Sequence, residues 1–294
     1  MRVAATRAVG ATTRAVDATT RAITVVSFNV NGLRAILRRS PRILEDVCAR
    51  TGADVLALQE TKLGREGARG IPGGGGLEGY GTVAHATSRA RAGYSGASAY
   101  VRDGFVSSMR DVRELAIGVD AFDVEGRALV VELDWCVVAC AYAPNSGAEL
   151  GRLRARADEW EPNARRRLNE LRASTGKPII YCGDLNVAHE EIDLWGRHAE
   201  NSKSAGFTPD ERASMTKLLD ECSLVDTFRA LHPNERAYSY WSYRGRAREL
   251  DRGWRLDYVL ADSSLRVVDA FRLPDVLGSD HCPVGATLAL EIDE

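Results

Sequence analysis

The chain has 294 residues, of which 45% are hydrophobic and 27% charged, and its formal net charge is −2. This composition suits one large α/β domain or two smaller ones with an ample core. The near-zero charge excludes the global basic field that many nucleic-acid binders carry. The longest apolar runs, 128–133 and 136–143, are too short to span a bilayer. The six cysteines have no CxxC pair and no zinc spacing, so we expect buried, reduced thiols in a cytoplasmic protein.

Residues 1–22 form an imperfect seven-residue repeat in which Thr-Arg-Ala recurs. The segment is rich in Arg and poor in acids, as transit peptides are, but it lacks the charge pairing of a coiled coil. We expect a disordered, low-complexity extension, or a start codon placed too far upstream. Residues 23–294 are expected to form a single folded domain.

Short apolar runs bounded by Gly, Pro and polar residues predict a series of buried strands. In chain order they are 23–30, 54–58, 97–101, 121–124, 127–133, 136–143, 177–180, 254–260 and 284–290. Helical spacing covers 33–50, with a break near Pro41, and 149–173, with an interruption at Pro162. A further helix over 209–221 begins with Thr208 as N-cap and Glu211 three residues later, which is a capping box. The glycines at 73–76 predict a surface loop, since no phosphate-loop motif follows them.

Polar side chains cluster where these strands end, and the stretch Gly183-Asp-Leu-Asn-Val-Ala-His is the centre of the pattern. The candidates are Asn29, Glu60, Tyr142, Asn145, Asp184, Asn186, Asp257, Asp280 and His281. Glu60 suits a hard cation such as Mg2+, which prefers oxygen ligands. Asp184, oriented by Asn29, could accept the proton of an attacking water. His281, fixed by Asp257, could stabilise phosphoryl oxygens together with Tyr142 and Asn186.

An aromatic stretch, Tyr238-Ser-Tyr-Trp-Ser-Tyr243, is followed directly by Arg244-Gly-Arg-Ala-Arg248. Aromatic and basic residues interleaved in this way are typical of a nucleic-acid groove. The alternative interpretation is an edge strand with a solvated arginine loop.

Eight ordered motifs together resemble one family, the exonuclease III-type apurinic/apyrimidinic (AP) endonucleases of the endonuclease/exonuclease/phosphatase superfamily. They are Phe28-Asn-Val-Asn-Gly-Leu-Arg-Ala, Leu58-Gln-Glu-Thr-Lys, Gly93-Tyr-Ser-Gly, Tyr142-Ala-Pro-Asn, Gly183-Asp-Leu-Asn-Val-Ala-His, Ala205-Gly-Phe-Thr-Pro-Asp-Glu-Arg, Trp254-Arg-Leu-Asp-Tyr and Gly278-Ser-Asp-His-Cys-Pro. The resemblance covers about residues 24–291, and the series is far more specific than any one motif.

The resemblance implies a DNase I-like α/β four-layer sandwich, in which two mainly antiparallel sheets pack face to face with helices outside. It implies Mg2+-dependent cleavage of double-stranded DNA 5′ to abasic sites, with 3′-5′ exonuclease activity and removal of blocked 3′ ends, and Mn2+ as an alternative ion. The expected enzyme works in base excision repair as a cytoplasmic, nucleoid-associated monomer without a membrane partner.

Site roles are carried over motif by motif. The resemblance implies catalytic roles for Tyr142, Asp184, Asn186, Asp257 and His281. It implies metal contacts from Asn31, Glu60, Asp184, Asn186, Asp280 and His281. It implies DNA contacts from Asn29, Asn145, Asn201, Tyr240, Trp241 and Arg246. Asn31 stands where some members have Asp, Ser204 where many have Asn, and Ala148 where some have a DNA-contacting Arg.

Three alternatives remain at this stage. A phosphoinositide phosphatase or sphingomyelinase of the same superfamily would reuse the Asn, Glu, Asp and His residues. A DNA-binding module without activity, and a ribonuclease, are the other two.

Overall fold

The computed structural model describes residues 20–64, 71, 76–196 and 201–291. Most of the predicted extension 1–22 and of the poly-glycine loop lies outside the described residues. The first strand begins at Thr20, three residues before the predicted boundary at Ile23, because Thr20–Ala22 pair with Ala289–Glu291. The first strand thus includes the last three residues of the predicted extension, and the division into extension and domain stays a prediction.

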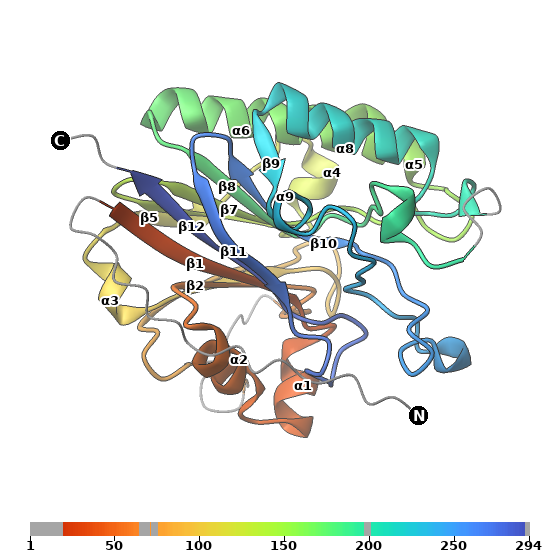
Figure 1. Cartoon of the computed structure of the whole chain (residues 1–294), viewed down its shortest axis with the longest axis horizontal. Coiled ribbons are helices and arrows are strands. Elements are labelled where there is room, and N and C mark those ends of the chain that lie inside the picture. Colours follow the sequence, from red (N-terminus) through yellow and green to blue (C-terminus); the bar gives the residue numbers. More distant parts are fainter. Residues whose placement is uncertain (1–19, 65–70, 72–75, 197–200, 292–294) are drawn as a thin grey trace.

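Two six-stranded sheets form the centre of the molecule (Figure 1). The first has the order β11-β12-β1-β2-β4-β3 and the second the order β5-β6-β7-β8-β10-β9. The first sheet consists of β1 (Thr20–Asn29), β2 (Val55–Gln59), β3 (Thr82–Ala86), β4 (Ala97–Val101), β11 (Arg266–Arg272) and β12 (Val284–Glu291). The second consists of β5 (Met109–Glu114), β6 (Ala128–Leu133), β7 (Val137–Tyr142), β8 (Ile179–Asp184), β9 (Leu224–Asp226) and β10 (Asp257–Asp262).

Each sheet contains one parallel pair, β1 with β2 and β7 with β8, and its other pairs are antiparallel. The predicted mainly antiparallel sheets are thus confirmed. In both parallel pairs the carboxyl ends of neighbouring strands meet at one edge of the sheet, where a loop can present polar side chains.

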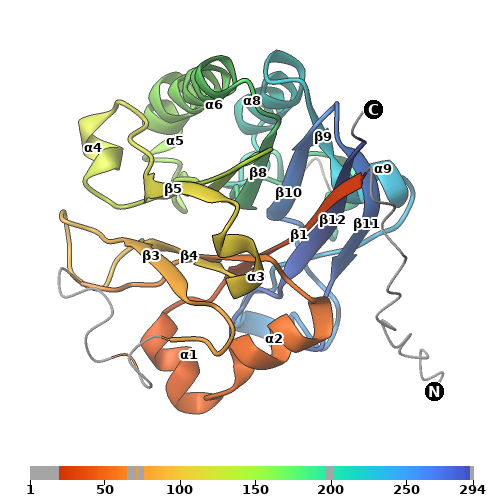
Figure 2. The ribbon, with the colours of Figure 1, turned by 90° about the vertical axis from the view of Figure 1, so that its left-hand side faces the viewer.

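Helices cover the outer face of each sheet, which gives the predicted four layers (Figure 2). The helices are α1 (Leu33–Arg39), α2 (Ile43–Thr51), α3 (Asp103–Val106), α4 (Asp120–Asp123), α5 (Leu153–Ala155), α6 (Glu161–Thr175), α8 (Pro209–Glu221) and α9 (Thr227–Leu231). A π-helical turn, Arg156–Trp160, joins α5 to α6, and short 3₁₀ turns cover Glu191–Asp193 and Arg244–Arg246.

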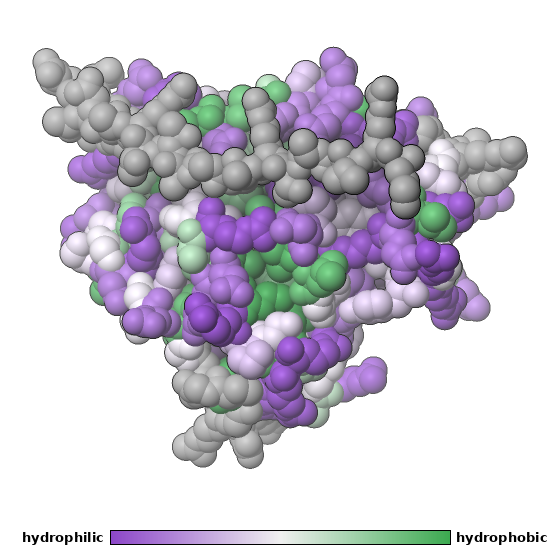
Figure 3. All heavy atoms as spheres, turned by 60° about the horizontal axis from the view of Figure 1, so that its bottom comes forward, coloured by the Kyte–Doolittle hydropathy of each residue, from purple (hydrophilic) through white to green (hydrophobic). Residues whose placement is uncertain are grey.

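Three apolar cores hold the layers together. One lies between the sheets and includes Val25, Val131 and Cys182. Another joins the second sheet to α6 and α8, and a third joins the first sheet to α1 and α2. On the face that comes forward from the bottom of Figure 1, hydrophilic side chains border an apolar area near the centre (Figure 3).

The structure corrects several sequence-based elements. The run 121–124 is the helix α4, not a strand, because the Asp123 carboxylate accepts hydrogen bonds from Ile117 and Gly118 and closes a helical turn. Pro162 does not interrupt its helix, since it lies in the first turn of α6, where no proline N–H is needed. The strand expected from Trp254 begins at Asp257. The predicted capping box of α8 is confirmed, with Thr208 Oγ1 accepting from the Glu211 N–H.

Four strands were not predicted: β3, β5, β9 and β11. The strand β5 lies at a sheet edge, and its exposed positions include Arg110, Asp111, Arg113 and Glu114, so it lacks an apolar alternation. All six cysteines are buried and free, as expected. Among the described residues, no helix combines the length and apolar character needed to cross a membrane.

Candidate active site

The ends of the central strands bring the predicted polar residues together. Asn29 ends β1, Glu60 follows β2, Tyr142 ends β7 and Asp184 ends β8. The antiparallel neighbour β10 begins with Asp257 directly opposite Asp184. Both sheets therefore contribute to one site at their shared edge.

Asp184 is buried at the centre of this site. The Asn29 amide donates to Asp184 Oδ2 over 2.8 Å and to Glu60 Oε1 over 3.0 Å, so one side chain links the two sheets. Burial, together with the charges of Asp257 and Glu60, raises the pKa of Asp184 to about 7, against the opposing effect of His281. A carboxylate whose pKa lies near neutrality is suited to accept a proton from water.

His281 lies beside Asp184 and is held by Asp257. Its Nδ1 is 2.8 Å from Asp257 Oδ2, and its Nε2 is 3.8 Å from Asp184 Oδ2. Burial alone would lower the pKa of His281, but the charges of Asp257 and Asp184 raise it to about 10. The imidazole is therefore cationic at neutral pH. Ligand atoms of Asp184, Asp257 and His281 lie within 4.8 Å of one another, so this group could hold a metal ion, although its imidazole Nδ1 is already hydrogen-bonded.

A second oxygen-rich group lies next to Glu60. The Asn31 amide donates to Asp280 Oδ1 over 2.9 Å, and Lys62 Nζ contacts both Asn31 Oδ1 and Glu60 Oε2. Although burial raises the pKa of Glu60, the Asn29 hydrogen bond and the Lys62 charge lower it overall. Carboxylate and amide oxygens are the donors that Mg2+ prefers, so these residues fit such an ion.

Lys62 is a site residue that the sequence analysis missed. Asn31, Glu60 and Lys62 all have positive φ angles, of 46°, 48° and 53°. Such left-handed, non-glycine conformations are strained and concentrate at functional sites. Their side chains converge because these turns follow the two parallel strands, and strand patterning alone gives no signal for that convergence.

Asn186 and Asn145 form the opposite wall. The Asn145 amide donates to Asn186 Oδ1 over 2.8 Å, and the Asn186 N–H donates to Asp184 Oδ1 over 2.9 Å. Asn186 has a φ of 50°, and its side-chain amide donates to Ala143 O over 3.0 Å. The side chain of Asn145 is exposed at the rim, where a phosphate could meet it.

Tyr142 packs under an arginine that was read only as a strand residue. The guanidinium of Arg127 lies 4.7 Å from the Tyr142 ring centroid and donates to Tyr142 O over 2.9 Å. Burial, followed by the nearby charges of Glu60 and Asp184, raises the pKa of the Tyr142 phenol well above its usual value. A neutral phenol beside Glu60 is a hydrogen-bond donor. The sequence signal for Arg127 was weak, a single charge at the start of an apolar run.

A partly exposed apolar surface, called the recess below, adjoins His281. The main chains of Tyr240 and Trp254 exchange two hydrogen bonds of 2.9 Å, and the Tyr240 ring lies 4.9 Å from the imidazole. Tyr240 and Trp254 pack against a buried cluster of Ala188, Leu194, Phe207 and Leu256. Tyr240 was predicted as a DNA contact, whereas Trp254 and Leu256 were not singled out.

Three predicted DNA contacts lie outside this cluster. Trp241 is only 2% exposed, and its indole donates to Asp251 Oδ1 over 3.1 Å, so it supports the loop from behind and does not line the recess. Arg246 is exposed on the 3₁₀ turn and pairs with Glu249. Asn201 lies before α8, where its carbonyl accepts from the Ser204 N–H.

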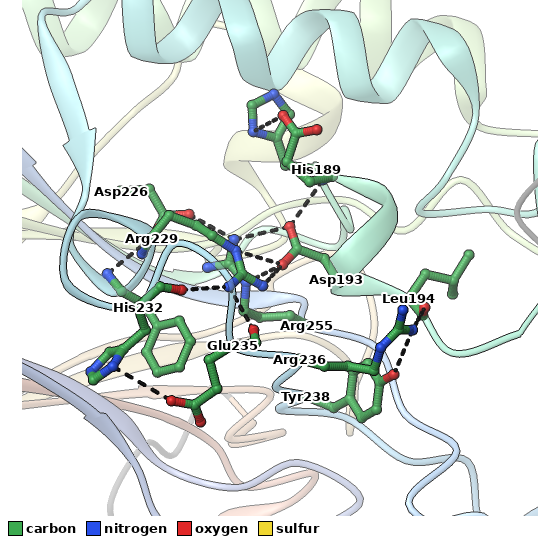
Figure 4. Close-up of polar contacts among 12 residues, drawn as sticks. His189, Asp193, Leu194, Asp226, Arg229, His232, Glu235, Arg236, Tyr238 and Arg255 are labelled. Carbon is green, nitrogen blue, oxygen red and sulfur yellow. Dashed lines mark hydrogen bonds and ion pairs between the residues drawn. The ribbon is translucent and has the colours of Figure 1, made fainter.

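A buried ion network surrounds Arg255 and Asp193 (Figure 4). Asp193 is fully buried and accepts from Arg255 Nε over 2.6 Å and Nη2 over 3.0 Å, and also pairs with Arg229. Arg255 Nη2 reaches Asp226 Oδ2 over 2.7 Å. Arg255 follows Trp254 directly, so this network fixes the chain between the recess and Asp257.

Comparison with known proteins gives a consistent result. The Endonuclease/Exonuclease/phosphatase family profile matches residues 26–281. An exodeoxyribonuclease of Bacillus subtilis is 39% identical over 264 residues, which cover 88% of this chain and 97% of the relative. A DNA-(apurinic or apyrimidinic site) endonuclease of Dictyostelium discoideum is 35% identical over 271 residues, covering 90% of this chain and 70% of the relative.

Solved structures agree with the fold. The crystal structure of an AP endonuclease from Leishmania major superposes with a TM-score of 0.82 at 31% identity, covering 91% of this chain and 88% of the other. An AP endonuclease from Archaeoglobus fulgidus has a TM-score of 0.75 at 27% identity, covering 90% and 98%. The predicted enzyme class, exodeoxyribonuclease or AP endonuclease, and the DNase I-like fold are thereby confirmed. The chain belongs to the Endonuclease/Exonuclease/phosphatase family.

Proposed function

We propose that this chain hydrolyses the phosphodiester bond 5′ to abasic sites in double-stranded DNA, with Mg2+ as its metal, as a nuclease of base excision repair. The observation that carries the proposal is the Asn29 amide, which joins Asp184 to Glu60. It places a proton acceptor beside a carboxylate suited to a metal, with the His281 cation within reach of the same oxygen.

Asp184 is proposed to accept the proton of the attacking water. Amides of Asn29 and Asn186 donate to its carboxylate and leave it in a fixed orientation. The pKa of about 7 means that much of the carboxylate is ionised at neutral pH. The cationic His281 and the neutral Tyr142 phenol are positioned as donors to phosphoryl oxygens, whose negative charge grows during attack.

Glu60, Asn31 and Asp280 would hold the metal, with Mn2+ as an alternative to Mg2+. When bound, such an ion neutralises charge on the phosphate and on the leaving oxygen. Predicted contacts of Asp184 and Asn186 with the ion belong to this proposal, whereas the cationic His281 has no free lone pair for the ion and is proposed as a donor to the phosphate instead. Lys62, which contacts both Asn31 and Glu60, would keep these two oxygen donors together.

The recess of Tyr240, Trp254 and Leu256 is proposed to receive the sugar that lacks a base. A nucleotide without a base has little stacking to lose when it leaves the helix, so extrusion is cheap and selective. The recess is apolar and adjoins His281, as a pocket for a bare deoxyribose requires.

The same chemistry at a duplex end would give 3′-5′ exonuclease activity and removal of 3′ blocks. Similarity to the relative named exodeoxyribonuclease supports this part of the proposal. Asn145, Asn201 and Arg246 are proposed to contact the DNA backbone, and Trp241 to brace the loop that carries Tyr240. We further propose that the enzyme acts as a monomer.

The test is cleavage of an end-labelled duplex with one tetrahydrofuran abasic analogue, in Mg2+ and in EDTA, beside an undamaged duplex. The proposal expects metal-dependent incision 5′ to the lesion and slower loss from the intact 3′ end. Asp184→Asn should bind the same duplex without cutting it. A wild-type protein that binds the abasic duplex but leaves it intact in Mg2+ would contradict the proposal.

A further inference from the structure

A second buried ion network lies behind the Asp184–Asn186 turn, on the side of α6 and α8. The guanidinium of Arg156 is fully buried. Its Nη2 donates to Leu185 O and its Nη1 to Asn186 O, each over 2.7 Å. Both acceptors are main-chain carbonyls of the turn that carries the proton acceptor and its amide neighbour.

The π-helical turn explains how Arg156 reaches this position. In such a turn the main chain bonds residues five apart, so side chains with that spacing come close on one face. Arg156 Nε accordingly pairs with Glu161 Oε1 over 3.1 Å. π-helical turns inside helices are frequent at functional sites.

Glu211 is the third charged residue of the network and connects it to the loop that carries Asn145. Its Oε1 accepts from Arg156 Nη1 over 3.1 Å and from Ser146 Oγ over 2.6 Å. Ser146 follows Asn145, whose amide holds Asn186. Glu211 Oε2 accepts from the N–H of Gly206 and from the N–H and hydroxyl of Thr208. One carboxylate therefore ties the Asn145 loop, the start of α8 and Arg156 together.

Asn186 needs such support because its main chain is in the left-handed region, with a φ of 50°. With its carbonyl fixed by Arg156, its N–H and side-chain amide stay directed at the Asp184 carboxylate. A carboxylate that accepts these bonds has little freedom to rotate away from an attacking water.

We propose that Arg156, together with Glu211, is a positioning residue of the nuclease, which acts through Asn186 and Asn145 on Asp184. This assignment rests on the proposed function. Loss of the guanidinium lets the Asp184–Asn186 turn relax and lowers the rate of cleavage, while Glu211 still holds Ser146 beside Asn145, so DNA affinity stays the same. Displacement of a reacting group by about 1 Å costs on the order of 10²-fold in rate.

The test is single-turnover cleavage of the abasic duplex by Arg156→Met, Asn186→Ala and the double variant, with DNA affinity measured separately. Arg156→Met should lose on the order of 10²-fold in rate with unchanged affinity. In the Asn186→Ala background the same change should cost nothing more, because its effect passes through Asn186. Arg156→Lys should restore part of the rate, since it keeps one donor and the charge.

Arg165→Met is the matched control. Arg165 also joins α6 to α8 through a largely buried guanidinium, by way of Glu221 and Ser214, without touching the turn. It should lower stability and leave the rate of folded enzyme unchanged. If Arg156→Met cuts as fast as Arg165→Met, the assignment is wrong. It is also wrong if Arg156→Met lowers the cleavage rate by the same factor in the wild type and in Asn186→Ala.

Ser146→Ala keeps the test decisive if Arg156→Met does not fold. This change removes a hydroxyl that donates to Glu211. It should slow cleavage when made alone, but not when it is added to Asn145→Ala. Equal costs in both backgrounds would overturn the assignment. Failure of wild-type enzyme to cut the abasic duplex would instead overturn the proposed function and this assignment with it.

Discussion

Two buried ion networks lie behind the site, and they differ in the groups that accept hydrogen bonds from their central arginines. Arg156 donates to two main-chain carbonyls of the catalytic turn as well as to Glu161 and Glu211. Arg255, by contrast, donates from its guanidinium to the carboxylates of Asp193 and Asp226 (Figure 4). The first network is therefore coupled to the geometry of the chemistry, and the second to the folded state and the recess wall. Burial of a charge does not by itself say which role it serves.

The largest effect on the cleavage rate is expected at Asp184, the residue that the first network positions. Asp184→Asn removes the proposed proton acceptor, and we expect the cleavage rate to fall on the order of 10³- to 10⁴-fold. Its amide oxygen keeps one of the two acceptor positions and the site loses only a negative charge, so binding of the abasic duplex should persist. Rates come from single-turnover cleavage and affinity from a gel-shift titration. If Arg156→Met lowered the cleavage rate more than Asp184→Asn does, the comparison would fail. A positioning residue cannot contribute more to the rate than the residue that it positions.

The second network is tested by Asp193→Asn. Removing the charge of one partner of a buried pair typically costs about 3–5 kcal/mol. Here it leaves Arg229 without its carboxylate and Arg255 with that of Asp226 alone. We expect this loss in the free energy of unfolding measured with urea. Asp111→Asn, in an exposed pair with Arg113, is the control and should change the unfolding free energy by less than about 1 kcal/mol.

The lowered pKa of Asp193 also predicts how the stability of the fold changes at acid pH. Burial would raise the pKa of Asp193, but Arg255 and Arg229 lower it below its ordinary value of 3.8. Its contribution is thus fully present above that value and is lost as the pH falls through the lower pKa of the folded state. The difference in stability between wild type and Asp193→Asn should shrink below pH 3.8. A constant difference down to pH 2 would contradict this reading of the network.

The recess wall gives an intermediate effect. Trp254→Ala should weaken recognition of the abasic duplex by about 1–2 kcal/mol, because the sugar loses buried apolar contact with the indole ring. Exonuclease activity on an undamaged duplex should change less. Trp195→Ala, at an exposed tryptophan outside the recess cluster, is the control. Equal losses on both duplexes would mean that the recess does not select the lesion.

The smallest effect is expected at the rim. Arg246 is exposed and pairs with Glu249, and its proposed partner is a phosphate. Arg246→Ala should reduce the salt dependence of DNA binding by about one counterion, with a modest loss of affinity. Arg266→Ala removes a similar exposed pair, with Glu291, at the opposite end of β1 from Asn29. An equal change in salt slope for both variants would argue against a phosphate at Arg246.

The site residues that could be predicted from the sequence lie near a strand end and carry a carboxylate, amide or imidazole suited to the chemistry. Asp184 and Asn186 follow an apolar run, and strand ends are where such a fold presents polar groups. Lys62, Arg127 and Arg156 were not predicted because their roles depend on contacts across the fold. Arg156 looked like one of several helix-surface charges, and the π-helical turn that directs it inward has no signature in the spacing of apolar residues.

The fold itself shows the same limit. Strands with continuous apolar runs, such as β7, were found, and the edge strand β5 was not, since its charged residues face solvent. The run 121–124 has strand-like composition, but a local hydrogen-bonding side chain, Asp123, outweighs propensity there.

The position of β1 has a consequence for how the enzyme is made. This first strand lies between β2 and β12, and β12 directly follows the segment that carries His281. Asn29 meets Asp184 across 155 positions of sequence, and Ser279 Oγ binds Asn29 O across 250. Contacts of such long range form late in folding. A ribosome-bound chain therefore carries an incomplete catalytic site until the segment of His281 and the strand that follows it have been released.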